Sequence, residues 1–364
     1  MIIDIIAGAR PNFMKIAPII TAIKKAQQNN YPIKYRLIHT GQHYDQKMSG
    51  DFFEQLGIPE PDVNLGAGGG SQAEQTAAIM IGYEKELIKK PVDLVLVVGD
   101  VTSTMACSIV AKKLNIKVAH VEAGIRSFDL AMPEEINRMV TDSITDYFFT
   151  TSEVANQNLR FYGIPDERIF FVGNTMIDTL LKQMPFFLKP DFWDELELKN
   201  SQYIVMTLHR PSNVDSPTQL KALLEVLENF NDKITIIFPV HPRTKNNLKT
   251  FGIELEHVKT VDPLGYLQFN YLVQHAKGVI TDSGGITEET TVMGIPCLTL
   301  RDSTERPETC TIGTNVLIGT QASALDEKLK DLMAGNWRKG GIPPLWDGMA
   351  AERIVKKLIE LYNL

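Results

Sequence analysis

Short runs of β-branched and other apolar residues alternate with amphipathic stretches along almost the entire chain. Such short runs are typical of buried strands, and strands that alternate with helices form parallel sheets. The pattern therefore predicts an α/β protein with two similar halves. In the first half we expect strands at residues 2–7, 35–40, 93–98, 117–121, 146–151 and 169–172. In the second half we expect them at residues 203–208, 234–240, 258–261, 278–281, 296–300 and 315–318.

The alternation of strands and helices lapses between Met184 and Ser201, where prolines and aromatic residues gather. Such a segment is typical of a boundary between domains. We therefore expect one domain over residues 1–182 and a second over residues 183–347. Residues 348–364 follow a turn-rich stretch and have the pattern of an amphipathic helix, which need not pack on the second domain.

Composition excludes several classes of protein. The 364 residues are 44% hydrophobic and 22% charged, which suits two packed cores and excludes a disordered or fibrous chain. No stretch approaches the roughly 18 apolar residues that a membrane span needs. The apolar start of the chain reaches Arg10 too early for a signal peptide. We therefore expect a cytoplasmic protein without a membrane partner.

Charge and cysteine content narrow the choice of ligand. The net charge of -7 argues against nucleic acid as a partner, but it is compatible with a local positive pocket for a small phosphate-bearing ligand. The three cysteines have unrelated spacings, so neither a disulfide framework nor a CxxC metal site is expected. A GxGxxG fingerprint for NAD is absent after the first strand, and DxD occurs nowhere. Cationic side chains, rather than a metal or another cofactor, would then balance the phosphate charge.

Polar residues suited to catalysis follow many of the expected strands. Because the carboxyl ends of parallel strands meet at one edge of a sheet, such residues converge on a ligand site. Turns and helix caps are the alternative for any single Asp, Asn or Ser, but they explain His, Arg and Glu less well. Two facing sheets would enclose one site between the domains. The residues concerned are Gly8, Arg10, Gln42, His43, Gly99, Asp100, Glu122, His209, Arg210, His241, Arg243, Asp282 and Arg301.

A phosphate site is predicted at residues 283–285, where the sequence Ser-Gly-Gly follows one strand and opens a helix. Glycines let a phosphate approach backbone N–H groups, and the helix dipole favours the anion, although an ordinary N-cap is the alternative. Glu289 lies about one turn further along and could accept hydrogen bonds from ribose hydroxyls. Near the start of the chain, Arg10 and Lys15 are either a pair of solvated surface side chains or a second group of contacts that binds a pyrophosphate.

Several acidic residues lie between His120 and Arg138. Pro133 favours a helix start, so Glu134 and Arg138, at positions i and i+4, share one helical face. A surface ion pair is the alternative. The nearness in sequence of Glu122 favours instead a cluster of carboxylates, which could raise one or more pKa values enough for acid and base catalysis.

Together these stretches resemble the non-hydrolysing UDP-N-acetylglucosamine 2-epimerases, from Gly8 to about Thr320. The resemblance rests on the motifs GARPNFMK, VVGDVTST, HVEAGIRS, MPEEINR, TLHR, HPRT, TDSGGITEE and RDSTERPE, in that order. It implies two Rossmann-like domains of the GT-B type, the second of which binds the nucleotide. It also implies a C-terminal helix over residues 348–364 that crosses back to the first domain, and a homodimer.

The resemblance further implies roles for individual residues. The implied catalytic residues are Asp100, Glu122, Glu134 and His209. The implied nucleotide and phosphate contacts are Arg10, Lys15, Leu264 (through its backbone), Phe269, Ser283, Gly284, Gly285, Glu289 and Arg306. Of these, Leu264, Phe269 and Arg306 rest on the resemblance alone. We add Arg138, beside the acidic cluster, and His241, which follows a strand, to the expected substrate-binding residues.

The implied reaction is the interconversion of UDP-N-acetylglucosamine and UDP-N-acetylmannosamine. The hydrogen on C2 of the sugar is not next to a carbonyl, so its direct removal would leave an unstabilised carbanion. Expulsion of UDP from C1 while C2 loses its proton avoids that charge and gives 2-acetamidoglucal, and re-addition of UDP completes the reaction. We expect nucleotide binding to close the domains and exclude water from this intermediate.

Some features leave alternatives open. Ala9 and Asn12 depart from the family's usual first phosphate loop. TGQHYD and TLHRPSNVD resemble the branch that epimerises UDP-2,3-diacetamido-2,3-dideoxyglucuronic acid, whereas the stretch from Arg306 resembles the UDP-N-acetylglucosamine enzymes. Gln42 fits an allosteric nucleotide-sugar pocket, but Asp45 does not. A GT-B glycosyltransferase that uses a UDP-sugar and a nucleotide-sugar sensor without turnover are the rival functions.

Overall fold

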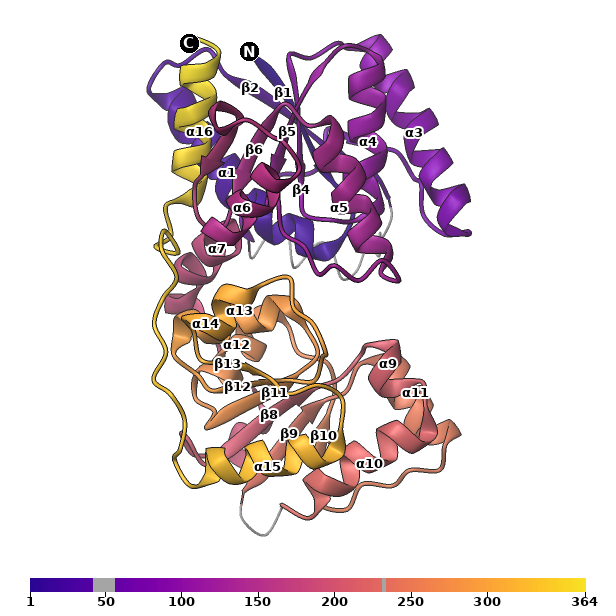
Figure 1. The fold of residues 1–364 in the computed structure, drawn as a ribbon, viewed down its shortest axis with the longest axis vertical. Coiled ribbons are helices and arrows are strands. Elements are labelled where there is room, and N and C mark those ends of the chain that lie inside the picture. The colour runs from indigo at the N-terminus through magenta and orange to yellow at the C-terminus, as the bar shows by residue number, and fades with distance from the viewer. Residues whose placement is uncertain (42–55, 231–233) are drawn as a thin grey trace. The chain divides into compact units, whose positions relative to one another are not determined.

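The computed structural model describes residues 1–41, 56–230 and 234–364. The chain divides into two compact units, one formed by Met1–Lys182 with Pro344–Leu364 and the other by Gln183–Pro343. Each unit has its own sheet and its own helices (Figure 1). Gln42, His43 and Asp45 lie outside the described residues.

A parallel sheet with the strand order β3-β2-β1-β4-β5-β6-β7 forms the centre of the first unit. Its central strand β4 is the run LVLVV, and all of its residues are buried. Such a continuous apolar run is expected for a strand that helices cover on both faces. The strands are β1 (Ile2–Ala7), β2 (Lys34–His39), β3 (Val63–Asn64), β4 (Leu94–Val98), β5 (Lys117–Val121), β6 (Tyr147–Thr150) and β7 (Ile169–Phe171).

Helices cover this sheet on both sides. Figure 1 shows α1 and α16 on one side and α3, α4 and α5, next to one another, on the other. A capping box formed by Ser71 and Glu74 begins α3. The helices of the unit are α1 (Arg10–Gln28), α3 (Gln72–Lys89), α4 (Thr102–Lys113), α5 (Pro133–Ile144), α6 (Glu153–Phe161), α7 (Thr175–Gln183) and α16 (Ala350–Leu361).

The C-terminal segment belongs to the first unit. The indole N–H of Trp346, which is buried, donates to the carbonyl of Thr151 at 3.0 Å. Helix α16 then begins where the carboxylate of Asp178 accepts the N–H groups of Ala350 and Ala351, at 3.1 and 2.7 Å. These two N–H groups have no partner within the helix, so Asp178 caps it from a neighbouring element. The apolar face of α16 packs against α1.

The second unit is a similar parallel sheet with the strand order β10-β9-β8-β11-β12-β13. Its strands are β8 (Tyr203–Thr207), β9 (Thr235–Pro239), β10 (Lys259–Val261), β11 (Gly278–Thr281), β12 (Cys297–Thr299) and β13 (Asn315–Leu317). Its helices are α8 (Phe192–Glu195), α9 (Pro211–Val214), α10 (Pro217–Glu228), α11 (Pro242–Thr250), α12 (Tyr266–Gln274), α13 (Gly284–Met293), α14 (Pro307–Thr311) and α15 (Ala322–Met333).

The predicted α/β fold is confirmed. Every expected strand is present, and its ends lie within one residue of the expected positions. Helix α5 begins at Pro133, as predicted. The short strand β3 was not expected from the sequence. Among the described residues, no helix combines the length and apolar character that crossing a membrane requires.

Both sheets have the strand order of a doubly wound fold. In the first sheet the direction of winding reverses between β1 and β4, and in the second it reverses between β8 and β11. Loops from such a neighbouring pair diverge to opposite faces of the sheet and leave a crevice at the carboxyl ends of the strands. Each unit therefore has one place where a ligand is expected to bind.

Replacement of Asp178 tests how the C-terminal helix is attached. Burial raises the pKa of Asp178 to about 6, although the two backbone N–H groups act against this rise. We expect Asp178→Ala to lower the free energy of unfolding by about 1 kcal/mol, because the first turn of α16 loses its cap. Urea denaturation of the full chain measures this change. Asp326→Ala, which removes a partly exposed ion pair with Lys330, serves as the control and should cost less than about 0.5 kcal/mol. Equal losses in the two variants would contradict the capping role.

Candidate active site

The loop after β1 is tied to the end of β4 by Asn12. Its side-chain oxygen accepts the N–H groups of Gly8 and Ala9, each at 3.1 Å, and its amide nitrogen donates to the carbonyl of Val98 at 3.1 Å. This side chain therefore joins the two strands at which the winding of the first sheet reverses. Arg10 is the first residue of α1, and its side chain lies outside the described part of the structure.

Lys15 and Glu122 form a buried ion pair at the same edge of the sheet. The ammonium nitrogen of Lys15 lies 2.7 Å from a carboxylate oxygen of Glu122, and the Glu122 side chain is only 2% exposed. Gly99, after β4, has a φ of +65°, and a Cβ at this position would lie 2.8 Å from the ammonium nitrogen of Lys15. Glycine is therefore required here both by conformation and by space. The predicted phosphate ligand Lys15 thus contacts a predicted catalytic carboxylate.

Asp100 is held by a second buried cation, Arg138. One guanidinium nitrogen of Arg138 lies 2.5 Å from a carboxylate oxygen of Asp100, and another lies 2.7 Å from Glu135. The side chain of Arg138 is only 1% exposed. Asn137, its neighbour in α5, donates to the backbone carbonyl of Asp100 at 2.8 Å. Helix α5 therefore positions Asp100 through two consecutive residues.

The ion pair between Glu134 and Arg138, which was the alternative to a carboxylate cluster, is not the one observed within α5. Arg138 bonds to Glu135, three residues before it, whereas Glu134 is exposed. Glu135 is buried and also accepts the backbone N–H groups of Ser127 and Phe128, at 3.0 and 3.1 Å. Burial acts to raise the pKa of Glu135, but these N–H groups and Arg138 outweigh it and lower the pKa. Helical periodicity alone does not distinguish a partner three residues away from one four residues away. Here the buried Glu135, and not the exposed Glu134, pairs with Arg138.

A buried histidine supports the same loops. One ring nitrogen of His120 lies 2.7 Å from Asp142, and the other lies 2.8 Å from the carbonyl oxygen of Gly99. Arg126 also contacts Asp142, at 2.7 Å. Burial acts to raise the pKa of Asp142, but His120 and Arg126 outweigh it and lower the pKa. The sequence motif contains His120, but nothing in the sequence shows that it contacts Gly99.

In the second unit, His209 and Asp282 follow the neighbouring strands β8 and β11. The Nδ1 atom of His209 lies 2.7 Å from a carboxylate oxygen of Asp282, which is buried. Helix α13 begins two residues after Asp282, at Gly284. The first N–H groups of such a helix have no partner within it and can bind an anion. A Cβ at Gly284 would lie 2.9 Å from the Glu305 carboxylate, so the backbone is closely packed at this point.

Glu289 lies on α13 and is buried. The hydroxyl of Tyr266 donates to its carboxylate at 2.8 Å. Burial raises the pKa of Glu289 to about 7, and the nearby charge of Glu288 acts in the same direction. Hydrogen bonds from Tyr266 and Asn270 act against this rise. A carboxylate in this position can still accept hydrogen bonds from hydroxyl groups of a ligand.

The remaining predicted residues of the second unit have diverse surroundings. Arg306 is buried and its Nε lies 2.5 Å from a carboxylate oxygen of Glu288. His241 caps α11, and its pKa is lowered by burial and by the charges of His209 and Arg243. Leu264 and Phe269 are half-buried and pack against the core of this unit. The expectation that residues of both units contact one ligand stays a prediction.

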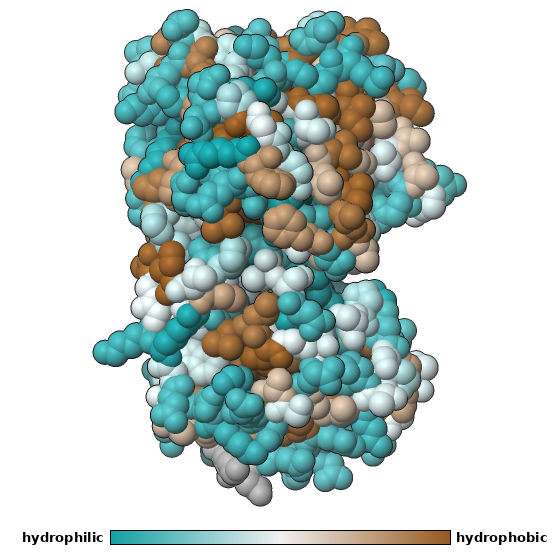
Figure 2. Space-filling view, in the orientation of Figure 1, coloured by the Kyte–Doolittle hydropathy of each residue, from teal (hydrophilic) through white to brown (hydrophobic). Residues whose placement is uncertain are grey.

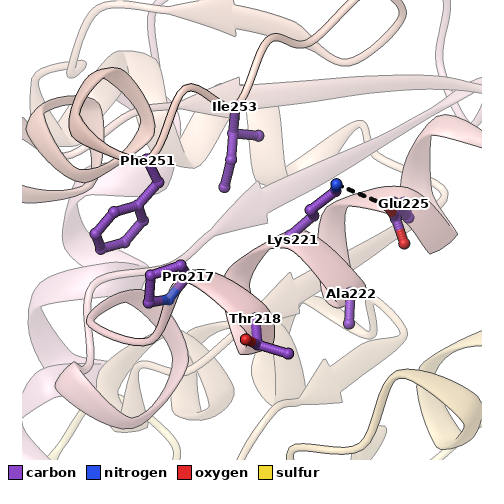
Figure 3. A pocket seen from close by; sticks show the side chains of 7 residues that line it. All are labelled: Pro217, Thr218, Lys221, Ala222, Glu225, Phe251 and Ile253. Carbon is purple, nitrogen blue, oxygen red and sulfur yellow. Dashed lines mark ion pairs between the residues drawn. The ribbon is translucent and has the colours of Figure 1, made fainter.

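A separate pocket of about 370 Å³ lies between α10 and the residues that follow α11 (Figure 3). The predicted site residues do not line it. Its charged groups are Lys221 and Glu225, which form an exposed ion pair with each other at 3.8 Å. It is lined by Pro217, Thr218, Lys221, Ala222, Glu225, Phe251 and Ile253. Because its charged groups neutralise one another and no predicted catalytic group faces it, we do not consider it the active site.

Comparisons with known proteins extend over almost the whole chain. The family described as UDP-N-acetylglucosamine 2-epimerase matches residues 24–359. The UDP-N-acetylglucosamine 2-epimerase of Methanocaldococcus jannaschii is 41% identical over 373 residues, which cover 98% of this chain and 99% of that protein. The UDP-2,3-diacetamido-2,3-dideoxy-D-glucuronate 2-epimerase of Pseudomonas aeruginosa is 37% identical over 359 residues, which cover 98% of this chain and 99% of that protein.

Solved structures agree with these matches. The crystal structure of the UDP-GlcNAc 2-epimerase of Methanocaldococcus jannaschii in complex with UDP-GlcNAc and UDP resembles this chain with a TM-score of 0.88. The two chains are 40% identical, and the match covers 99% of this chain and 100% of that one.

The Lys15–Glu122 pair can be tested by removing one charge and then both. We expect Lys15→Met to lower the free energy of unfolding by about 3–5 kcal/mol, because it leaves the buried Glu122 carboxylate without its Lys15 partner. The double variant Lys15→Met/Glu122→Gln should recover most of this loss, because neither charge remains. Chemical denaturation of the full-length variants measures both values. A double variant as unstable as the single one would show that the ion pair is not the cause.

Proposed function

The chain belongs to the UDP-N-acetylglucosamine 2-epimerase family, and we propose that it interconverts UDP-N-acetylglucosamine and UDP-N-acetylmannosamine by inversion at C2. The observation that carries this proposal is the placement of Asp100 and Glu122. They follow the neighbouring strands β4 and β5, and each contacts a buried cation. Two carboxylates fixed at one edge of a sheet are suited to removing and returning a proton.

We propose that the reaction proceeds by elimination and re-addition. A carboxylate takes the proton from C2, the electron pair of the C–H bond forms the C1–C2 double bond, and the C1–O bond breaks. UDP leaves with the electron pair of the C1–O bond. A second carboxyl group, in its protonated form, then gives its proton to the opposite face of C2, where the electron pair of the double bond forms the new C–H bond. A UDP oxygen forms the C1–O bond again with its own electron pair. The overall reaction is redox-neutral, so it needs no oxidant or reductant.

Asp100, Glu122 and Glu134 are the proposed acid and base groups. The first two are held by Arg138 and Lys15, so their positions are fixed before the substrate binds. Glu134 is exposed in the first turn of α5, where the start of the helix favours a negative charge. The assignment of base and acid among the three stays open.

We propose that residues of the second unit bind the leaving diphosphate. We propose that His209 and the N-terminus of α13 stabilise its charge as the C1–O bond breaks. Glu289 would bind the ribose hydroxyls, because its carboxylate is held by Tyr266 at the side of the same helix. The other proposed contacts to the substrate are Arg10, Lys15, Arg138, His241, Leu264 (through its backbone), Phe269, Ser283, Gly284, Gly285 and Arg306.

UDP-2,3-diacetamido-2,3-dideoxyglucuronic acid is the second candidate substrate. The 37% identity to a protein named as the 2-epimerase of this sugar supports it. The same elimination would apply, because C2 carries an acetamido group and the leaving group is again UDP. The ratio of the two kcat/KM values decides between the substrates.

Incubation with UDP-N-acetylglucosamine alone in deuterated water tests the reaction. We expect UDP-N-acetylmannosamine with deuterium at C2, because the returning proton comes from a group that exchanges with solvent. NMR spectroscopy detects both the new sugar and the label. If UDP-N-acetylglucosamine and UDP-2,3-diacetamido-2,3-dideoxyglucuronic acid both stayed unlabelled and unchanged in the absence of an acceptor, the result would favour the glycosyltransferase or the sensor over an epimerase.

Four variants serve as controls for this experiment. Asp100→Asn, Glu122→Gln, Glu134→Gln and His209→Asn should each lower turnover by about a hundredfold or more, because each removes a positioned acid, base or charge-stabilising group. Calorimetry with UDP shows whether a variant still binds the nucleotide. Near-normal turnover in all four would refute these roles.

We also propose that the chain forms a homodimer, as the family resemblance implies, through the outer face of α3, α4 and α5. Ile88 and Ile81 on α3 are 66% and 56% exposed, and Ile136 on α5 is 43% exposed. Met105 and Ile109 on α4, between these helices, are half-buried. Figure 2 shows a band of hydrophobic surface over α4 and α5. An apolar patch of this kind is typical of a protein interface.

Charged substitutions on this face test the dimer. We expect the wild-type chain to sediment as a dimer and the double variant Ile88→Lys/Ile136→Lys to sediment as a monomer. The reason is that burial of two ammonium groups at an apolar contact is energetically unfavourable. Ile342→Lys, at an exposed isoleucine of the second unit, is the matched control and should remain dimeric. Sedimentation equilibrium distinguishes these outcomes. A double variant that stays dimeric would place the interface elsewhere.

Finally, we propose that the protein works in the cytoplasm, because its proposed substrate is a soluble nucleotide sugar.

A further inference from the structure

Asp282 is a buried carboxylate that the proposed mechanism does not yet use. It follows β11 and is 0% exposed. One of its oxygens accepts the backbone N–H groups of His209 and Arg210, at 3.0 and 2.9 Å, and the side-chain amide of Asn213 at 3.1 Å. The other oxygen lies 2.7 Å from Nδ1 of His209 and 3.2 Å from the backbone nitrogen of the same residue. Both oxygens are therefore engaged as acceptors.

These contacts favour the ionised form of Asp282, because backbone and side-chain N–H groups donate to both of its oxygens. Burial acts to raise the pKa of Asp282, but hydrogen bonds from His209, Arg210 and Asn213 and the charge of His209 outweigh it and lower the pKa. An ionised carboxylate can only accept hydrogen bonds, so Nδ1 of His209 must carry a hydrogen. Nε2 is then the ring nitrogen that remains for a ligand. The side chain of His209 is 45% exposed, which leaves room for such a contact.

Other charged and titratable groups lie near His209. The rings of His209 and His241 lie 6.3 Å apart, and the pKa of His241 is lowered by burial and by the charges of His209 and Arg243. The guanidinium of Arg243 pairs with Asp215. The charge of Asp282 acts on the pKa of His241 in the opposite direction, but it is His209 that contacts the Asp282 carboxylate, at 2.7 Å.

The position of Asp282 connects it to the phosphate site. Thr207 and Thr281 are paired neighbours at the ends of β8 and β11, the strands at which the winding of the second sheet reverses. Their hydroxyls lie 2.7 Å apart, and Thr281 also accepts the N–H of Ser283 at 3.0 Å. Asp282 lies between Thr281 and the start of α13. One carboxylate thus holds both His209 and the loop that leads into the proposed anion-binding helix.

We propose that Asp282 is a positioning residue for the epimerase reaction. Its carboxylate accepts a hydrogen bond from Nδ1–H of His209 and so orients the imidazolium form of the ring, in which Nε2 also carries a hydrogen, to donate a hydrogen bond from Nε2–H to the diphosphate. Asp282 itself does not touch the substrate. As the C1–O bond breaks, negative charge develops on the diphosphate oxygen, and the hydrogen bond from Nε2 strengthens without a net proton transfer. This inference rests on the proposed function, because it assigns the leaving group to His209.

A double-mutant cycle tests whether Asp282 acts through His209. We expect Asp282→Asn to lower kcat by about a hundredfold while KM changes by less than about threefold, because the lost interaction strengthens only as the C1–O bond breaks. In the His209→Asn background, the same substitution should lower kcat by no more than about threefold. Equal losses in both backgrounds would overturn the proposal and would indicate a structural role for Asp282.

Nitrogen-15 NMR of the histidine-labelled full chain provides a readout that does not depend on activity. The His209 signal is identified by its loss in His209→Asn. We expect the wild-type chain to show Nδ1 of His209 protonated, and Asp282→Asn to show a mixture of tautomers. A wild-type Nδ1 without a proton would overturn the proposal. A wild-type chain that shows the protonated Nδ1 but does not epimerise either candidate sugar would refute the proposed function instead.

Discussion

The pairing of opposite charges at the carboxyl ends of the parallel strands is the interaction on which the candidate site depends. An unpaired charge in a protein interior costs several kcal/mol, so a buried carboxylate is stable only with a cation or several N–H donors beside it. The buried Glu122 has Lys15, the half-buried Asp100 has Arg138, and the buried Asp282 has N–H groups of His209, Arg210 and Asn213. Each pair joins residues that are far apart in sequence, so the charges that serve the chemistry also fix the ends of the strands relative to one another.

The two units use the same strand order for different tasks. In the first unit, carboxylates and the cations that hold them follow β4 and β5, next to the point where the winding of the sheet reverses. In the second, a histidine follows β8 and the N-terminus of α13 follows β11, and both are suited to an anion. This division agrees with a reaction in which proton transfer at the sugar must be coordinated with the departure of a diphosphate. A common fold therefore does not determine the chemistry, which follows from the residues after the strands.

The fold was predictable from the sequence because its strands are continuous apolar runs bounded by turns, whereas β3, with two residues, has no detectable periodicity. Asp100, Glu122 and His209 were predicted as site residues because each follows such a run. Their partners were not, because helical periodicity places both Glu134 and Glu135 near Arg138, and only the packed structure selects Glu135. The contacts of Asp282 with His209 are likewise tertiary, since 73 residues separate them. Local patterns thus locate reactive groups, and long-range packing decides what holds them.

The attachment of α16 to α1 has a consequence for the order in which the chain folds. Helix α16 packs on the first unit and is capped by Asp178, so the first unit contains segments from both sides of the second unit. Domains generally fold as units during synthesis, starting from the N-terminus. In this chain, the second unit is fully synthesised while the first still lacks its closing helix. Vectorial translation therefore lets the inserted unit mature first, and the first unit completes its packing only once α16 has been synthesised.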